Sequence, residues 1–242
     1  MKTLLLIPLM ALMLVFANSL VSLADDDKDK KAEVSDEIER LTESTNTVRD
    51  VLGIPENGIP QDMLDNAAAV VVIPDLIKAA FIAGAKNGDG VMAVRDASGW
   101  TLPTFVEMTG GSVGWQIGVE ETDLVLVFMD EKHVKKLLNG EFTFGADASV
   151  AVGPVGRQAS AGTNQNAKSA VYAYSRSKGV FAGVSLDGSK IYIDKEANAR
   201  VYGAGTTPSD VLYGQKVKAP KEAADFKLTL NSMTKPNMKA KP

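Results

Sequence analysis

A serine in a glycine-rich segment has the sequence context that most directly suggests catalysis. Gly110-Gly111-Ser112-Val113-Gly114 matches G-x-S-x-G, the nucleophile elbow of many serine hydrolases. Asp123 or Asp130, and then His133, follow in the chain order that those hydrolases use. The elbow needs a strand before the serine and a helix after it, whereas the residues after Gly114 alternate between apolar and polar as a strand does. The segment therefore predicts a glycine-rich bend in a strand, and a serine hydrolase that uses Ser112 is a remote alternative.

The composition excludes most other site chemistry. The chain has 242 residues and no cysteine, so disulfides, thiolate metal sites and cysteine nucleophiles are absent. His133 is the single histidine and lies among Lys132, Lys135 and Lys136, which would repel a metal ion. Gly84, Gly88 and Gly90 surround Lys86, but no Gly-Lys-Ser/Thr follows, so a nucleotide loop is not indicated. We expect a protein that is not an enzyme and that has no metal and no cofactor.

An apolar segment from Pro74 to Gly84 contains a single lysine, Lys78. Such a segment can place apolar side chains in the acyl boundary of a membrane while lysines remain at the headgroups. The alternative interpretation is a core strand or helix with one lysine that reaches solvent. The apolar candidates for lipid contact are Leu76, Ile77, Phe81 and Ile82.

The first 24 residues have the pattern of a cleavable signal peptide. Lys2 precedes an apolar stretch from Leu4 to Phe16, and Ser22-Leu23-Ala24 supplies the small residues of a cleavage site. Cleavage is predicted after Ala24 and would send the mature chain to the periplasm, where it could associate peripherally with a membrane. An uncleaved anchor is disfavoured because the apolar run is short for a bilayer span.

Charge is distributed unevenly along the chain, whose net charge is −4. Seven lysines lie after residue 215 against only Glu222 and Asp225, so the part before them is strongly acidic. An acidic body argues against nucleic acid as a partner, because that affinity depends on neutralising phosphates. The lysine-rich segment 214–242 has few large apolar residues, and we expect it to be mostly disordered.

The remaining pattern predicts an α+β fold. It consists of a predominantly antiparallel, strongly curved or barrel-like sheet, flanked by an N-terminal helix and a few short helices. Ser35 is the predicted N-cap of the first helix, Asn87-Gly88-Asp89-Gly90 is a predicted turn, and 180–193 is a predicted hairpin. Further helices are expected from Pro60, over 131–138 and after Asp194. The predicted segments are a signal peptide (1–24), an acidic linker (25–34), the N-terminal helix (35–58), the main domain (59–213) and the tail (214–242).

Eight blocks in order, between about Ile59 and Gly203, resemble the SYLF-domain family of lipid-binding proteins in its secreted bacterial branch. They are Ile73-Pro74 through Phe81, Gly90–Arg95, Thr109–Gly118, Asp123–Met129, Gly145–Ser149, Gly153–Arg157, Tyr174–Gly179 and Phe181–Gly188. The resemblance implies a non-enzymatic module that binds membrane lipids. Eukaryotic members bind phosphorylated headgroups, and some of them engage actin.

The sequence and the resemblance together predict a periplasmic protein that contacts phospholipid headgroups or a membrane surface. The chain lacks the cysteine that carries a lipid anchor in many bacterial relatives, so reversible contact is expected. The alternative is an envelope structural or protein-interaction module with protein partners. The headgroup candidates are Lys78, Lys86, Arg95, Arg157, Arg176 and Lys178.

Overall fold

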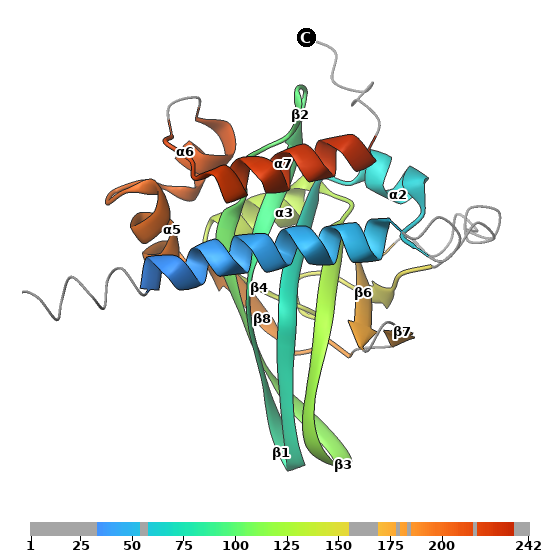
Figure 1. Cartoon of the computed structure of the whole chain (residues 1–242). Helices are drawn as coiled ribbons and strands as arrows, with labels where there is room; N and C mark the ends of the chain where they lie inside the picture. The colour runs from blue at the N-terminus through green and yellow to red at the C-terminus, as the bar shows by residue number, and fades with distance from the viewer. Residues whose placement is uncertain are drawn as a thin grey trace, which may run out of the picture.

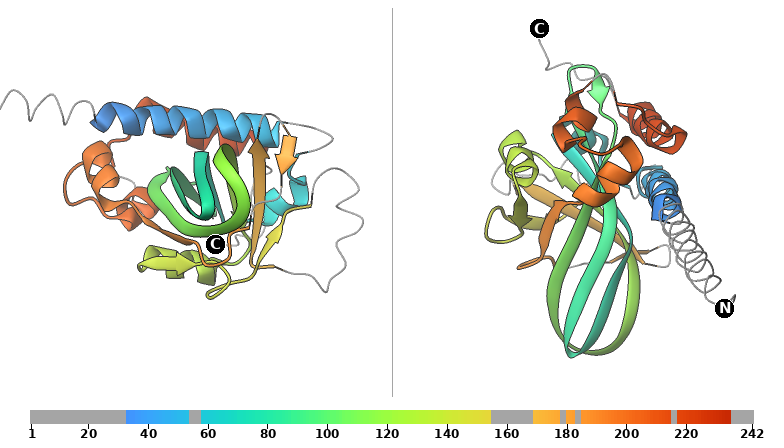
Figure 2. Two further views of the ribbon diagram at one scale, coloured as in Figure 1. Left: turned by 90° about the horizontal axis from the view of Figure 1, so that it is seen from below. Right: turned by 90° about the vertical axis from the view of Figure 1, so that its left-hand side faces the viewer.

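Two long paired strands dominate the structure, which is a computed structural model. It describes residues 33–53, 58–154, 169–177, 180–182, 185–214 and 217–234, and only the backbone of 78–84, 112–120 and 180–182. Strand β1 (Ala69–Asp96) pairs antiparallel with β3 (Thr104–Phe128) along nearly its whole length. We call this pair the ribbon. It runs away from the helices, bends at its far end and returns (Figures 1 and 2).

A register shift lies where the ribbon bends. Ala80 pairs with Gly118 and Ile82 pairs with Gly114, so three residues of β3 lie opposite one residue of β1. Extra residues in one strand of a pair form a bulge, which bends the strand and increases its twist. We call the part around this bend the distal ribbon, defined as residues 79–85 of β1 and 111–119 of β3.

The returning half of β1 passes so close to its first half that glycine is required. A Cβ atom on Gly90 would lie 2.1 Å from the carbonyl oxygen of Val72, and one on Gly88 would lie 2.6 Å from Cγ2 of Ile73. The turn predicted at 87–90 is therefore wrong, because these residues continue β1 and pair with residues 109–106 of β3. Their glycines serve a close crossing of backbone rather than a turn.

Replacing Gly90 by alanine tests this crossing. The added Cβ would overlap a backbone oxygen, so we expect a loss of roughly 2–3 kcal/mol in the free energy of unfolding, measured by denaturant titration. Gly111→Ala is the matched control in the same ribbon, because nothing lies within 4 Å of its added Cβ. Its effect should stay within about 0.5 kcal/mol. Equal effects of the two variants would contradict the crossing.

The two arms of β3 carry the rest of the sheet. Strand β6 (Val171–Ser177) pairs with the arm that ends at Phe128, and β8 (Lys190–Ile193) pairs with the arm that begins at Thr104. The sheet therefore curls around the ribbon, as Figure 2 shows, which confirms the predicted fold class. The other strands are β2 (Gly99–Trp100), β4 (Glu141–Thr143), β5 (Val150–Val152), which is parallel to β6, and β7 (Val180–Ala182).

Successive residues of the central strands alternate between two hydrophobic cores. Val125 and Val127 belong to a core under the N-terminal helix, whereas Leu124 and Leu126 belong to a core on the opposite face of the sheet. All four are fully buried. This explains the continuous apolar run, because a strand that is covered on both faces needs apolar residues at every position.

Helices cover both faces of the sheet. The N-terminal helix covers residues 33–52, so Ser35 lies inside it rather than at its N-cap, and 33 and 34 are helical rather than linker. The helices expected over 131–138 and after Asp194 are present, and Asp130 and Asp194 cap them by accepting bonds from the backbone N–H groups of Lys132 and Ala197. The other helices are α2 (Gln61–Asn66), α3 (Glu131–Leu138), α5 (Lys195–Tyr202), α6 (Pro208–Tyr213) and α7 (Lys221–Met233).

The predicted hairpin over 180–193 does not form. Strand β7 pairs with β6, whereas β8 pairs with β3 and β4. Gly188 has a φ of +77°, so the Asp187-Gly188 turn itself is present. The turn therefore redirects the chain from one arm of the sheet toward the other instead of joining two neighbouring strands.

The expectation of a mostly disordered tail is wrong for residues 221–233, which form α7. Phe226, Leu230 and Ala223 lie on one face of this helix and are fully buried in the first core. Helix α7 lies beside the N-terminal helix (Figures 1 and 2). Arg49 of the N-terminal helix donates a hydrogen bond of 3.3 Å to Thr229 of α7. Three apolar residues at helical spacing are enough to dock the segment because a preformed core receives them.

Truncating Phe226 and Leu228 separately tests the docking of α7. Phe226→Ala removes a fully buried ring and should lower the free energy of unfolding by roughly 3–5 kcal/mol. Leu228 is 63% exposed on the same helix, so Leu228→Ala should change it by no more than about 0.5 kcal/mol. Similar unfolding curves for the two variants would mean that α7 does not pack as described.

Candidate functional site

The apolar segment predicted to meet lipid lies in the ribbon. Ile77 is 46% exposed. Leu76 is only 2% exposed and belongs to the second core, so its proposed entry into a membrane is wrong. Phe81 and Ile82 lie in the distal ribbon beside the bend, and their side chains lie outside the described part of the structure. The beginning of the segment therefore reaches into the core, and the backbone of its later part forms the distal ribbon.

Two of the predicted headgroup cations have structural contacts instead. Arg95 is 8% exposed, donates a hydrogen bond of 2.6 Å to the Leu64 carbonyl and stacks over the ring of Trp100. Lys86 is 6% exposed, and its ammonium donates to the carbonyl of Ser185. Buried charges that are already bonded in this way are poor ligands for a headgroup, so these two assignments are corrected.

The remaining predicted cations do not meet at one place among the described residues. Arg176 forms an ion pair of 3.1 Å with Asp50 of the N-terminal helix. Lys78 lies opposite Glu120 in the strand register. Arg157 and Lys178 lie outside the described residues. The structure thus gives no basis for a single phosphate-binding patch made from the predicted cations.

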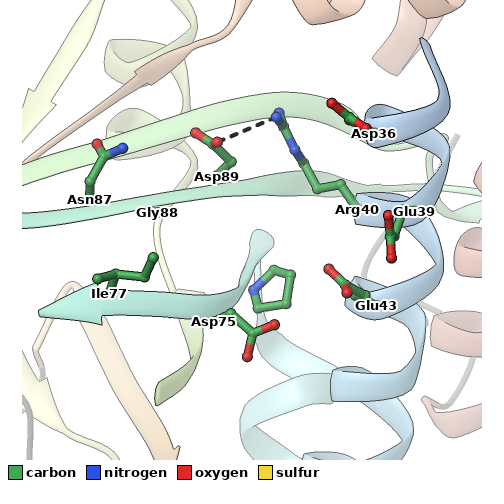
Figure 3. A pocket seen from close by; sticks show the side chains of 10 residues that line it. Asp36, Glu39, Arg40, Glu43, Asp75, Ile77, Asn87, Gly88 and Asp89 are labelled. Carbon is green, nitrogen blue, oxygen red and sulfur yellow. Dashed lines mark ion pairs between the residues drawn. The ribbon is translucent and has the colours of Figure 1, made fainter. Parts of the chain in front are cut away.

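A polar groove that the sequence analysis missed lies between the N-terminal helix and β1, with a volume of about 420 Å³. Figure 3 shows carboxylates of the helix facing carboxylates of the ribbon, with an Arg40–Asp89 ion pair of 3.4 Å across the groove. Arg40 also pairs with Asp194 at 3.3 Å and stacks on Phe105. The residues that line it are Asp36, Glu39, Arg40, Glu43, Pro74, Asp75, Ile77, Asn87, Gly88 and Asp89.

Repulsion between carboxylates and burial away from water raise the pKa of acidic side chains at and beside the groove. Burial raises the pKa of the Glu43 carboxyl above its usual range, and Asp75, Glu39 and Asp123 raise it further. Burial also raises the pKa of Asp123, against the hydrogen bond that its carboxylate accepts from the backbone of Asp75. Asp75 adopts a φ of +52° and lies between Ile73 and Leu76, where the pairing of β1 with β3 has another register shift. The groove therefore holds more negative charge than its surroundings neutralise.

Part of the acidic lining of the groove can be recognised in the sequence. Asp36, Glu39 and Glu43 recur at a spacing that places them on one face of a helix. Such a stripe is most often a solvated face, and nothing in the sequence says that Asp75 and Asp89 lie opposite it. Their proximity follows from the bulge and from the crossing of β1, which are tertiary features.

The position of Ser112 argues against the hydrolase alternative. Ser112 lies within β3, which continues as a strand to Phe128, so the helix that an elbow requires does not follow. His133 is 8% exposed in α3 and packs edge-on against Phe142. Within the described residues, no three histidine or acidic side chains group as metal ligands, and no helix is long and apolar enough to cross a bilayer.

Replacing Glu43 by glutamine tests the electrostatics of the groove. The folded-state pKa of Glu43 is raised, so ionised Glu43 destabilises the fold above that pKa, and the penalty disappears when protonation is complete below the ordinary pKa. Glu43→Gln should raise Tm by about 1–2 °C near pH 7, and the gain should vanish as the pH falls through the glutamate range. Glu222→Gln on α7 is the control, and an equal gain there would contradict a local cause.

Comparison with known proteins identifies the family to which the chain belongs. The model of the Ysc84 family, described as "Las17-binding protein actin regulator", matches residues 109–233, which is over half of the chain. The chain belongs to the Ysc84 (SYLF) family. The matched region contains one full arm of β3, both strands that extend it and the helix α7.

Several curated relatives are similar over most of this chain. Protein YSC84 of Saccharomyces cerevisiae is 39% identical over 169 residues, which cover 68% of this chain and 36% of the relative. LAS seventeen-binding protein 3 of the same species is 38% identical over 161 residues, which cover 65% and 35%. SH3 domain-containing YSC84-like protein 1 of Homo sapiens is 33% identical over 182 residues, which cover 74% and 53%. The chain thus spans between about a third and a half of the length of these relatives, and none of their names is that of an enzyme.

Proposed function

We propose that this protein is a non-enzymatic periplasmic lipid-binding protein whose distal ribbon contacts a membrane surface. The observation that carries the proposal is the projection of an uncharged pair of strands beyond the helices and the rest of the sheet (Figure 1). No charged residue occurs from Ala79 to Ala85 or from Met108 to Val119. A protein in water has little reason to extend such a segment away from its own core.

The composition of the distal ribbon suits the boundary between headgroups and acyl chains. It contains Phe81, Ile82, Trp115 and Ile117 among small residues. Large apolar residues gain free energy when they leave water, and tryptophan is enriched at membrane interfaces because its ring is apolar and its N–H is polar. Lys78 and Glu120 flank the uncharged part and can remain at headgroup level.

The pairing of the ribbon limits how deep the contact goes. Across the distal ribbon, β1 and β3 pair with each other, and the described strands β6 and β8 pair with β3 only outside it. Backbone groups at such edges need water or another partner and are not tolerated in the hydrocarbon interior. We therefore propose shallow, reversible contact, in which residues 1–24 direct secretion and are removed after Ala24.

Vesicle cosedimentation of the mature chain tests the proposal. Wild-type protein should pellet with vesicles of phosphatidylcholine and phosphatidylethanolamine in 150 mM salt. Ile82→Asp places a charge at the bend and should weaken binding at least about tenfold, because a large apolar side chain is lost from the contact and a charge must be hydrated. Leu228→Asp makes the same change at an exposed apolar residue of α7 and should bind like wild type. Pelleting that is independent of vesicles would reject membrane contact.

A protein partner is the second candidate, and the names of the relatives favour it. The family description and the name of one yeast relative refer to binding of Las17. By analogy, the sheet and helices of this chain would present a surface to an envelope protein. Capture of one envelope protein by delipidated mature chain, with Ile82→Asp having no effect on vesicle binding, would favour this candidate over lipid contact.

A further inference from the structure

One ring nitrogen of His133, in the first turn of α3, is buried and unbonded. The residue is 8% exposed, and its Nδ1 atom is buried without a hydrogen-bond partner. Its ring packs edge-on against Phe142, with 6.0 Å between the ring centroids, and Phe142 in turn contacts Phe128 and Phe144. A proton added to the neutral imidazole makes both ring nitrogens donors. Nδ1 would then carry a buried N–H without an acceptor, which is costly.

The place of His133 in the helix adds to that cost. It is the third residue of α3, which begins at Glu131 after the N-cap Asp130. The N-terminus of a helix carries partial positive charge, so a cation in the first turn is disfavoured. Burial lowers the pKa of His133 below its usual range, and the neighbouring Lys132 lowers it further. Asp130 and Asp147 act in the opposite direction but do not reverse the shift.

The other charged groups around α3 are paired with one another in the part of the chain that the structure describes. The pairs are Lys136–Asp147 at 2.5 Å, Lys135–Glu131 at 3.5 Å and, on the neighbouring strands β4 and β8, Glu141–Lys190 at 3.0 Å. The residues that β1 and β3 contribute to the second core are apolar. Burial raises the pKa of Tyr213 of α6, which interacts with Glu131, so this phenol stays uncharged at and below neutral pH.

Helix α3 is short and depends on the core against which it packs. It has eight residues, and a helix of that length is marginal by itself in water. Its buried residues are His133, Val134 and Leu137, and the last two belong to the second core. Surface ion pairs such as Lys135–Glu131 add little stability. A cost at His133 therefore falls on one of the three buried residues of the helix, and local opening of α3 needs less free energy than unfolding of the sheet.

We propose that His133 makes α3 a pH-sensitive cover of the second core, which opens when the imidazole takes up a proton. The packed helix is fully stable while the imidazole is neutral, above the ordinary histidine pKa of about 6.5. Because the pKa of His133 is lower in the packed helix than in an open one, this stability is lost as the pH falls through the lower pKa. Opening would expose Val134 and Leu137. The inference concerns a different part of the molecule from the distal ribbon and does not depend on membrane contact.

Proton NMR of the untagged mature chain measures the titration directly, because His133 is the single histidine of the sequence. The Cε1–H signal of the imidazole should shift with a midpoint below about 6.5, the value of an exposed histidine. A midpoint at or above that value would overturn the proposal. This measurement uses the wild-type chain and needs no variant.

Hydrogen exchange followed by mass spectrometry locates the opening. After correction for the intrinsic effect of pH, the amides of residues 131–138 should exchange at least several-fold faster at pH 5.5 than at pH 7.5. Each pKa unit between the packed and open forms changes their ratio about tenfold. Asp130 and Asp147 stay ionised at both pH values, because hydrogen bonds from Lys132 and Lys136 lower their pKa. Helix α7 is the internal reference and should show no such acceleration.

Variants of α3 identify the group responsible. His133→Leu removes the titrating ring and keeps an apolar side chain, so it should abolish the acceleration, and His133→Met repeats the test if the first variant does not fold. Lys135→Gln changes the exposed face of the same helix, where Lys135 is 71% exposed, and should respond like wild type. Acceleration that is absent in wild type, that persists without His133 or that reaches α7 equally would overturn the proposal.

Discussion

The close crossing of β1 over its own first half is the constraint on which the rest of the structure depends. Gly88 and Gly90 allow the returning backbone to touch the region from Val72 to Leu76. Only with that contact do the two arms of β3 diverge, so that β6 and β8 extend the sheet in opposite directions. The uncharged middle of the ribbon projects beyond this crossing (Figure 2).

A small set of buried polar contacts holds the helices against this sheet and shapes the groove. Glu37 is 2% exposed and accepts two bonds from Arg200 at 2.7 and 2.9 Å, which fastens the N-terminal helix to α5. Asn198 is fully buried and accepts bonds from Thr104 and from the backbone of Phe105, which fastens α5 to the start of β3. Because a buried polar group is costly unless it is bonded, these contacts fix the position of the helix that carries three of the five acidic residues of the groove.

Local features of the structure were predictable from the sequence, and features that depend on distant contacts were not. The capping aspartates Asp130 and Asp194 act within three residues, and the apolar run 124–128 reports burial on both faces by itself. The glycines at 88 and 90 suit a turn or a crossing equally well until Val72 is known to lie against them. For the site, Leu76 and Arg95 were assigned to the surface because side-chain type alone does not show which residues a core will use. The docking of α7 depended in the same way on a receiving core.

The alternation of core residues along the central strands has a consequence for chain length. From Val70 to Ile73 and from Leu124 to Phe128, each neighbouring pair divides its side chains between two separate interiors. Adding or deleting one residue there would exchange the occupants of both interiors over the remainder of the strand. Insertions and deletions in related sequences should therefore occur at the bulges or two residues at a time. In that case the two cores keep their residues, and only the length of the projecting part of β1 and β3 varies.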